Sequence, residues 1–364
     1  MPLTSKHGGN TIRLKIILIL MIYIMFSFAV GQENTANYWM ERGDYFSSDF
    51  SEAAIRCYDK VIELDPKNAT AWYNKGVILS SQFKQNESLA AFNIAINLSP
   101  EDSNAWNAKG LGLYVGARLN QIVDDLLIDL NTEYPIINNK DTQMKILKGS
   151  VGPKEIWNYT FDVPLKTRRI AAGLNADDNN SELALVFEDP SGLASEENAD
   201  LGAEKLGVQI DSPESGQWTL NVYGYSVPVK ASTAFTVKLI SQSYSPERFS
   251  SSLEAVDKAL EFDPISLDPM ILKARVLIDC GEFEEAIKII DNALKIDPSN
   301  HEAWQTKGYI LMKQENYTEA IKNLNIANEL DNNGYIISSI SKNSINYSYY
   351  DAYAEQIDNK IVYI

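Results

Sequence analysis

The sequence has very few residues of the types that most often build metal centres and nucleophilic sites. Its 364 residues include only two cysteines and two histidines. After residue 31 the one histidine is His301, with no serine or cysteine motif beside it. The chain therefore offers neither a zinc-ligand set nor a histidine-dependent catalytic pair. We predict a protein that is not an enzyme, has no metal site and needs no cofactor.

Basic residues are also scarce relative to acidic ones. The chain has 32 Lys plus Arg against 49 Asp plus Glu, a formal net charge of −17 at pH 7. Such a field repels polyanions. The composition therefore excludes nucleic acid as an expected partner and disfavours anionic membrane surfaces.

The N-terminus has the three parts of a secretory signal. Basic residues up to Lys15 precede an apolar run over residues 16–30, and the small residues 29–31 stand before Gln32. The run is about 15 residues long, whereas a membrane-spanning helix needs about 20. We predict that residues 1–31 are a signal peptide and that the protein is exported, secreted or associated with the cell surface. An uncleaved membrane anchor is the alternative.

Two sets of five-residue words recur along the chain. WMERG, WYNKG, WNAKG and WQTKG begin at Trp39, Trp72, Trp106 and Trp304, and IELDP, INLSP, LEFDP and LKIDP end at Pro66, Pro100, Pro264 and Pro298. The closing prolines are 34 residues apart within each neighbouring pair. Proline ends a helix because it has no N–H to donate, and glycine lets two helices approach closely. Each unit is predicted to be a helix pair that must stack on its neighbours.

This pattern resembles the tetratricopeptide repeat over about half of the chain. One unit carries the motif at Trp72, Gly76, Phe92, Ala95 and Pro100, and another at Trp304, Gly308, Tyr317, Ala320 and Ala327. The unit over residues 267–300 departs from it, with Met270 and Ala274 in place of the Trp and Gly. The resemblance implies an α-solenoid that binds a protein or peptide.

The third repeat is interrupted. Trp106 and Trp304 are 198 residues apart, and two repeat steps leave 130 residues unexplained. Residues 251–263 read as the second helix of a repeat, but no Trp-containing motif precedes them. We therefore interpret the third repeat as split, with its first helix at 104–116. The alternative places the missing helix at 120–131, with Ile122 and Asp129 where the repeat has small residues.

The interrupting stretch alternates polar and apolar residues in short runs that predict β-strands. The runs cover residues 144–148, 155–163, 168–174, 182–188, 206–210, 218–223 and 234–241, with turns at 189–192 and 213–216. Seven short strands predict an antiparallel β-sandwich. About 60 residues at its end, FEDPSG through IDSPESGQWTLNVYGYSVP, resemble the jelly-roll modules of secreted proteins.

The predicted fold class is therefore α+β and multidomain, a TPR α-solenoid interrupted by a jelly-roll-like sandwich. The predicted domains are a signal peptide (1–31), an N-terminal solenoid part (34–118), a linker or helix (119–142), a β-sandwich insert (143–245), a C-terminal solenoid part (249–334) and a capping segment (335–364).

The resemblance implies that partners lie along the first helices of the repeats. By register the candidate binding residues are Tyr73, Val77, Asn107, Leu111, Tyr114, Ile271, Arg275, Gln305 and Tyr309. Each of them can alternatively pack between repeats. We predict a non-catalytic, exported scaffold that binds a protein or peptide in this groove.

A second hypothesis makes the sandwich the functional part, a glycan- or polymer-binding module on a helical stalk. Trp157, Tyr159 and Tyr225 gathered on one sheet face would favour it. Loop aspartates at 177, 178, 189 and 200 lack the spacing of a dedicated calcium loop. Asn-x-Ser/Thr sequons, which allow glycosylation, occur at Asn68, Asn86, Asn97, Asn158, Asn179, Asn316 and Asn346. The sequence identifies neither the partner, the process nor the oligomeric state.

Overall fold

The computed structural model describes residues 35–47, 51–126, 141–177, 181–194, 205–227, 232–314 and 316–330. The predicted signal peptide and the predicted capping segment lie outside these residues. The chain divides into two compact units, Met1–Ile128 with Glu247–Pro269, and Asp129–Pro246 with Met270–Ile364.

The first unit is built from helix pairs. Its helices are α2 (Ala36–Phe46), α3 (Ser51–Leu64), α4 (Ala69–Ser81), α5 (Gln85–Leu98), α6 (Ser103–Leu126) and α7 (Pro246–Phe262). Asn68 caps α4 because its Oδ1 accepts a hydrogen bond from the Ala71 backbone N–H at 3.0 Å. A Cβ atom at Gly76 would lie 2.6 Å from Cε1 of Phe92, so glycine is what allows α4 and α5 to pair this closely.

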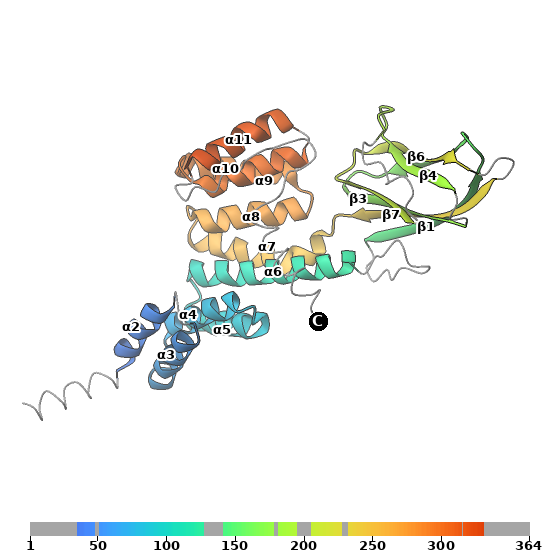
Figure 1. Ribbon diagram of the computed structural model, residues 1–364. Coiled ribbons are helices and arrows are strands. Elements are labelled where there is room, and N and C mark those ends of the chain that lie inside the picture. Colours follow the sequence, from blue (N-terminus) through green and yellow to red (C-terminus); the bar gives the residue numbers. More distant parts are fainter. Residues whose placement is uncertain are drawn as a thin grey trace, which may run out of the picture. The chain divides into compact units, whose positions relative to one another are not determined.

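Helices α6 and α7 lie side by side, although the whole β region separates them in the sequence (Figure 1). Ser103 Oγ donates to the Ala259 carbonyl oxygen at 2.9 Å. The ring centroids of Tyr114 and Phe249 are 6.0 Å apart. These contacts join the two segments in which the sequence predicts the halves of the third repeat.

Helix α6 is longer than the sequence predicts. It continues past Gly116 to Leu126, so residues 120–126 extend the first helix instead of turning back along it. No glycine or proline lies between residues 117 and 126 to end the helix.

Four further helices, α8 (Leu267–Asp279), α9 (Phe283–Ile296), α10 (His301–Lys313) and α11 (Tyr317–Leu330), complete the helical part, and nearly all of this segment belongs to the second unit. Gly281, with a φ of 75°, lies between α8 and α9 in the left-handed region that favours glycine. Asn300 Oδ1 accepts from the Ala303 N–H at 2.9 Å and caps α10.

All seven predicted strands are present in the second unit. They are β1 (Thr142–Val151), β2 (Ile156–Val163), β3 (Thr167–Ala176), β4 (Glu182–Glu188), β5 (Lys205–Asp211), β6 (Gly216–Ser226) and β7 (Thr233–Ser243). They form a sheet of order β1-β7-β3-β5 and a sheet of order β2-β6-β4, with every neighbouring pair antiparallel (Figure 1).

The two sheets contribute to one hydrophobic cluster. Leu147 and Val237 come from the first sheet, and Leu185, Leu220 and Trp218 from the second, and all are buried. The alternation of inward apolar and outward polar residues, which predicts the strands, is what supplies this cluster.

The first and last strands of the β region pair with each other. Thr142 lies opposite Gln242, and the Ser243 N–H donates to the Asp141 carbonyl oxygen at 2.8 Å. The chain therefore enters and leaves the β region at adjacent points. This arrangement suits an insertion within another fold, because the flanking segments need not be pulled apart.

Candidate functional site

Five predicted binding residues lie on the first helices of the first unit, and two of them are exposed. Val77 on α4 is 40 % exposed and Leu111 on α6 is 45 % exposed. Each stands five residues after the tryptophan of its repeat, so the two occupy the same register on helices that contact each other. Together they give this part of the surface two accessible aliphatic side chains.

Two more candidates in this unit, Tyr73 and Asn107, are partly buried. The Tyr73 ring centroid lies 6.1 Å from that of Phe92, and burial raises the pKa of the Tyr73 phenol. Asn107 Oδ1 is buried and has no hydrogen-bond partner among the described residues. A buried acceptor without a donor costs about 1–3 kcal/mol, so a rearrangement that gave Asn107 a donor would be favourable.

Two predicted binding residues are in the interior. Tyr114 is 5 % exposed because it packs against Phe249, and Ile271 is 2 % exposed. Both follow the alternative stated from the sequence, packing between helices instead of facing a partner. They are not accessible to a ligand in this structure.

The remaining candidates lie in the second unit and are partly buried. Arg275 Nη2 donates to Glu302 Oε2 at 3.2 Å. Gln305 and Tyr309 lie on α10, and the Lys313 ammonium nitrogen lies 5.6 Å from the Tyr309 ring centroid. These contacts link neighbouring positions of the helical part.

One recurring polar arrangement was missed by the sequence analysis. The fourth residue of each of the four Trp-containing motifs is basic: Arg42, Lys75, Lys109 and Lys307. Each of the three lysines lies over the ring of its own tryptophan, at 5.6 Å, 5.1 Å and 5.6 Å respectively. The signal is present in the sequence motifs WMERG, WYNKG, WNAKG and WQTKG, whose fourth residue is basic in every case.

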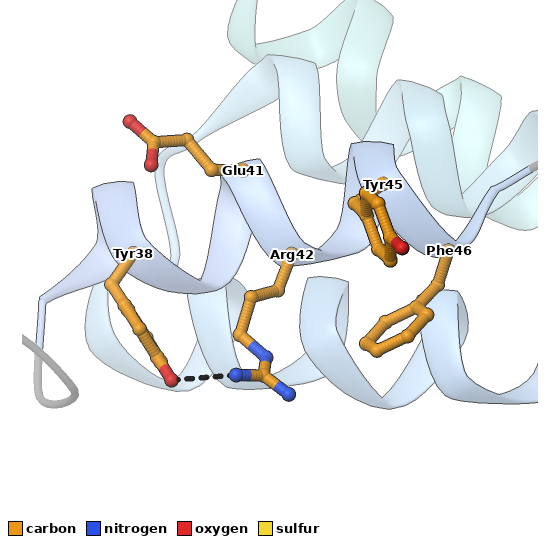
Figure 2. Close-up of a pocket in the computed structure, with 5 residues that line it drawn as sticks. All are labelled: Tyr38, Glu41, Arg42, Tyr45 and Phe46. Carbon is orange, nitrogen blue, oxygen red and sulfur yellow. Dashed lines mark hydrogen bonds between the residues drawn. The ribbon is translucent and has the colours of Figure 1, made fainter.

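The first of these basic residues has different surroundings. Figure 2 shows Arg42 on α2 with its Nη1 donating to Tyr38 Oη at 2.8 Å. The guanidinium carbon lies 5.4 Å from the Tyr38 ring centroid and 5.6 Å from that of Phe46. Together with Glu41 and Tyr45, these residues line a hollow of about 250 Å³. We call this set of five residues the α2 face.

The aromatic residues named for the glycan-binding hypothesis do not share one sheet face. Trp157 pairs with Val222 and Tyr159 with Leu220, so both rings point to the side that carries the core. Tyr225 lies on the opposite side of β6 and is exposed. Since side chains alternate along a strand, the three rings do not form one platform.

The described residues contain no group of three or more His, Cys, Asp or Glu that could hold a metal ion. Asp189 is engaged in its own turn, where Oδ1 accepts from the backbone N–H groups of Ser191 and Leu193 at 2.8 Å and 2.9 Å. Its hydrogen bonds, first that from the Ser191 side chain, lower the pKa of this carboxyl.

The sequons differ in their surroundings. Asn68 and Asn316 cap helices through Oδ1, whereas Asn86, Asn97 and Asn158 are exposed on α5 and β2. Asn179 and Asn346 lie outside the described residues. In the described part of the chain, no helix is both long and apolar enough to cross a membrane.

Comparison with protein families matches the helical segments. A family model described as TPR repeat matches residues 44–82, and one described as tetratricopeptide repeat matches residues 69–102. The chain contains tetratricopeptide repeats. Residues 247–327 match the family described as anaphase-promoting complex, cyclosome, subunit 3. None of the curated proteins compared with the chain matches it significantly.

Solved structures give weaker similarities. MamA is 12 % identical with a TM-score of 0.39 and covers 85 % of this chain and 100 % of its own. YrrB, described as a TPR protein with an unusual peptide-binding site, is 14 % identical with a TM-score of 0.39, covering 84 % and 92 %. A thermophilic TPR protein from Thermus thermophilus is 9 % identical with a TM-score of 0.43, covering 82 % and 92 %. Nothing about the function of this chain follows from similarity at this level.

Proposed function

We propose that this protein is a non-catalytic scaffold that binds a protein or peptide along the first helices of its TPR repeats. The observation that carries the proposal is the pair Val77 and Leu111, two exposed aliphatic side chains in the same register of consecutive first helices. Val77 lies within the residues that both TPR family models match, and Leu111 follows nine residues after the second match ends. Apolar area that leaves water on binding is the usual source of affinity.

The neighbouring side chains support an extended peptide as the ligand. Asn107 stands four residues before Leu111, and its acceptor oxygen has no donor among the described residues. A peptide backbone carries one N–H donor per residue, so a peptide lying against α4 and α6 is able to supply the missing hydrogen bond once the Asn107 side chain turns outward.

Two further elements complete the proposal. We interpret the two sheets as a β-sandwich of jelly-roll type that is inserted between the two helices of the third repeat, and we interpret residues 1–31 as an export signal. The partner is then an exported or cell-surface protein. The charge of the chain disfavours nucleic acid in this role.

A photocrosslinking experiment in the native host tests the proposal. A photoreactive phenylalanine analogue is placed at Val77, at Leu111 and, as a matched control, at Asn93, which is exposed on the second helix α5. We expect the same protein to be captured from positions 77 and 111 and not from 93. The captured protein is then purified and its affinity is measured against the wild-type chain and Leu111→Arg, which we expect to weaken binding about tenfold or more.

Equal capture from all three positions, or an affinity that Leu111→Arg leaves unchanged, would contradict the proposal. In either case the second hypothesis, binding through the β region, becomes the better one. It predicts that substitutions such as Tyr225→Ala reduce capture instead.

A further inference from the structure

Later first helices bury one face against the second helix that precedes them. The residue just before the tryptophan is Ala71, Ala105 or Ala303 in three repeats, and each is 0 % exposed. Ala105 shares a buried cluster with Ala95 and Ile96 of the preceding helix α5. A small side chain at this place lets the two helices approach closely.

The basic residue three positions after the tryptophan makes a second contact with the preceding helix. Lys75 Nζ lies 2.6 Å from Asp59 Oδ1 of α3, and Lys307 Nζ lies 2.8 Å from Asp291 Oδ1 of α9. Both aspartates stand seven residues before the proline that closes their repeat. Helix α5 precedes α6, and its residue seven positions before the closing proline is Asn93. Lys109 on α6 lies over the ring of Trp106.

Helix α2 also has a residue just before its tryptophan and a basic residue three positions after it. Among the described residues, however, no helix precedes α2. Tyr38 replaces the alanine and Arg42 replaces the lysine. Arg42 has no carboxylate within ion-pair distance in the described part of the chain, and its guanidinium lies over two aromatic rings instead (Figure 2). Tyr45 beside it is 78 % exposed. The α2 face therefore presents a cation among aromatic rings where the other repeats receive a helix.

We propose that the α2 face binds an amphipathic helix of another protein, and that this helix places an aspartate or glutamate against Arg42 as Asp59 does against Lys75. Arginine and tyrosine are the residue types that most often dominate an interface, because they combine large contact area with hydrogen bonding. The hollow of about 250 Å³ beside them leaves room for a side chain of the incoming helix. The ligand is defined by charge and shape, an acidic residue on an otherwise apolar helix face.

A second copy of this chain fits this role less well. The last described second helix, α11, has Asn325 at the place that Asp59 and Asp291 hold in α3 and α9. If α11 of a second copy packed against α2 as α3 packs against α4, Asn325 and not a carboxylate would lie beside Arg42. Charge complementarity favours a different protein.

The test uses the chain from Gln32 onward and a labelled, helix-stapled peptide with the sequence of residues 283–296, which contains Asp291. Binding is measured by fluorescence anisotropy for the wild type and Arg42→Gln. We expect Arg42→Gln to weaken binding up to about fivefold, as for a partly exposed ion pair. The Asp291→Asn peptide should lose the same factor, and combining both changes should cost no more than one.

A matched control is Lys60→Gln, since Lys60 is an exposed basic residue that pairs with Glu63 on α3 and lies outside the α2 face. It should leave peptide binding unchanged. A swap of charges, Arg42→Glu with an Asp291→Lys peptide, should restore part of the affinity lost by either change.

Three results would overturn the proposal. One is no binding to the wild type at about 1 mM peptide, since an affinity weaker than this is too low for a specific contact. Another is independent, additive effects of Arg42→Gln and Asp291→Asn. The third is self-association of the wild-type chain in sedimentation that Arg42→Glu abolishes, since a second copy would then be the occupant. All three leave crosslinking at Val77 and Leu111 unaffected, so the two proposals fail separately.

Discussion

Ser252 in α7 donates its hydroxyl hydrogen to the Gly110 carbonyl oxygen in α6 at 2.8 Å, and Ser88 in α5 makes the same contact with Gly76 in α4 at 2.9 Å. Both bonds are buried. The partners are 142 residues apart in the first pair and 12 in the second. The first pair therefore has 130 additional residues between its helices, yet reaches the same contact. We infer that α6 and α7 are one repeat whose connecting turn has been replaced by the β region.

The buried hydroxyl of Ser252 should contribute to stability as much as that of Ser88. Ser252→Ala removes the donor to Gly110 and should lower the free energy of unfolding by about 1 kcal/mol. Ser88→Ala is the matched control in an uninterrupted repeat and should cost a similar amount. Urea denaturation followed by circular dichroism measures both. A negligible effect of Ser252→Ala beside a clear effect of Ser88→Ala would contradict the equivalence of the two helix pairs.

Gly110 should tolerate no side chain. A Cβ atom there would lie 2.6 Å from Val256 Cγ2, so Gly110→Ala should destabilise the protein by about 1–3 kcal/mol. Val256→Ala combined with it should recover part of the loss. Gly116→Ala in the same helix meets nothing closer than Gln85 Nε2 at 3.6 Å and should be neutral or slightly stabilising. Thermal unfolding of the wild type and of these three variants distinguishes the outcomes.

The β region should be removable. Deleting residues 119–248 joins Arg118 to Phe249 and leaves Gly110 and Ser252 12 positions apart, the same separation as between Gly76 and Ser88. We expect a soluble helical protein, because stability in repeat arrays is close to a sum of local and nearest-neighbour terms. Far-ultraviolet circular dichroism and size-exclusion chromatography check this. Loss of helix with aggregation would show that the connecting β region is needed to hold α6 and α7 together.

The two thiols should be unreactive in the folded protein. Cys57 and Cys280 are buried and unpaired. Burial raises the pKa of Cys280 from 9.0 to about 12, and that of Cys57 in the same direction. Because the thiolate is the reactive form, a thiol reagent at pH 8 should label neither cysteine until urea unfolds the chain. Rapid labelling in the absence of urea would contradict their buried placement.

The raised pKa of Cys280 also determines the direction in which the stability of the folded protein changes with pH. Cys280 holds its proton more tightly when folded, so its contribution to stability is fully present below pH 9 and is lost as the pH rises towards about 12. Cys280→Ala should show a shallower loss of stability over this range than the wild type.

Export is tested at the N-terminus. If residues 1–31 are a signal peptide, the protein isolated from its native host begins at or near Gln32. Edman sequencing or mass spectrometry of the N-terminal peptide gives the answer. An intact Met1 on a protein recovered from the cytoplasm would contradict the prediction.

The sequence predicted the strands well and the accessible surface less well. Strand positions follow from local alternation, and all seven predicted runs lie within or overlap observed strands. The binding surface depends on which helix covers which face. Val77 and Leu111 are exposed as expected, whereas Tyr114 is buried by Phe249, a residue from beyond the β region. No local pattern around Tyr114 reports that contact.

The sequence by itself determined the elements of this protein: helices from the recurring Trp, Gly and Pro positions, and strands from the alternation of apolar residues. These are properties of short segments, set by backbone sterics and local burial. Only the tertiary structure decided that α6 pairs with α7 and that Trp157 and Tyr225 face opposite sides of a sheet. It also decided that, among the described residues, no carboxylate lies beside Arg42 as Asp59 lies beside Lys75. Each of these depends on residues that are distant in the sequence and adjacent in space. The free energy of such a contact depends on both residues, and no short segment of the sequence contains both.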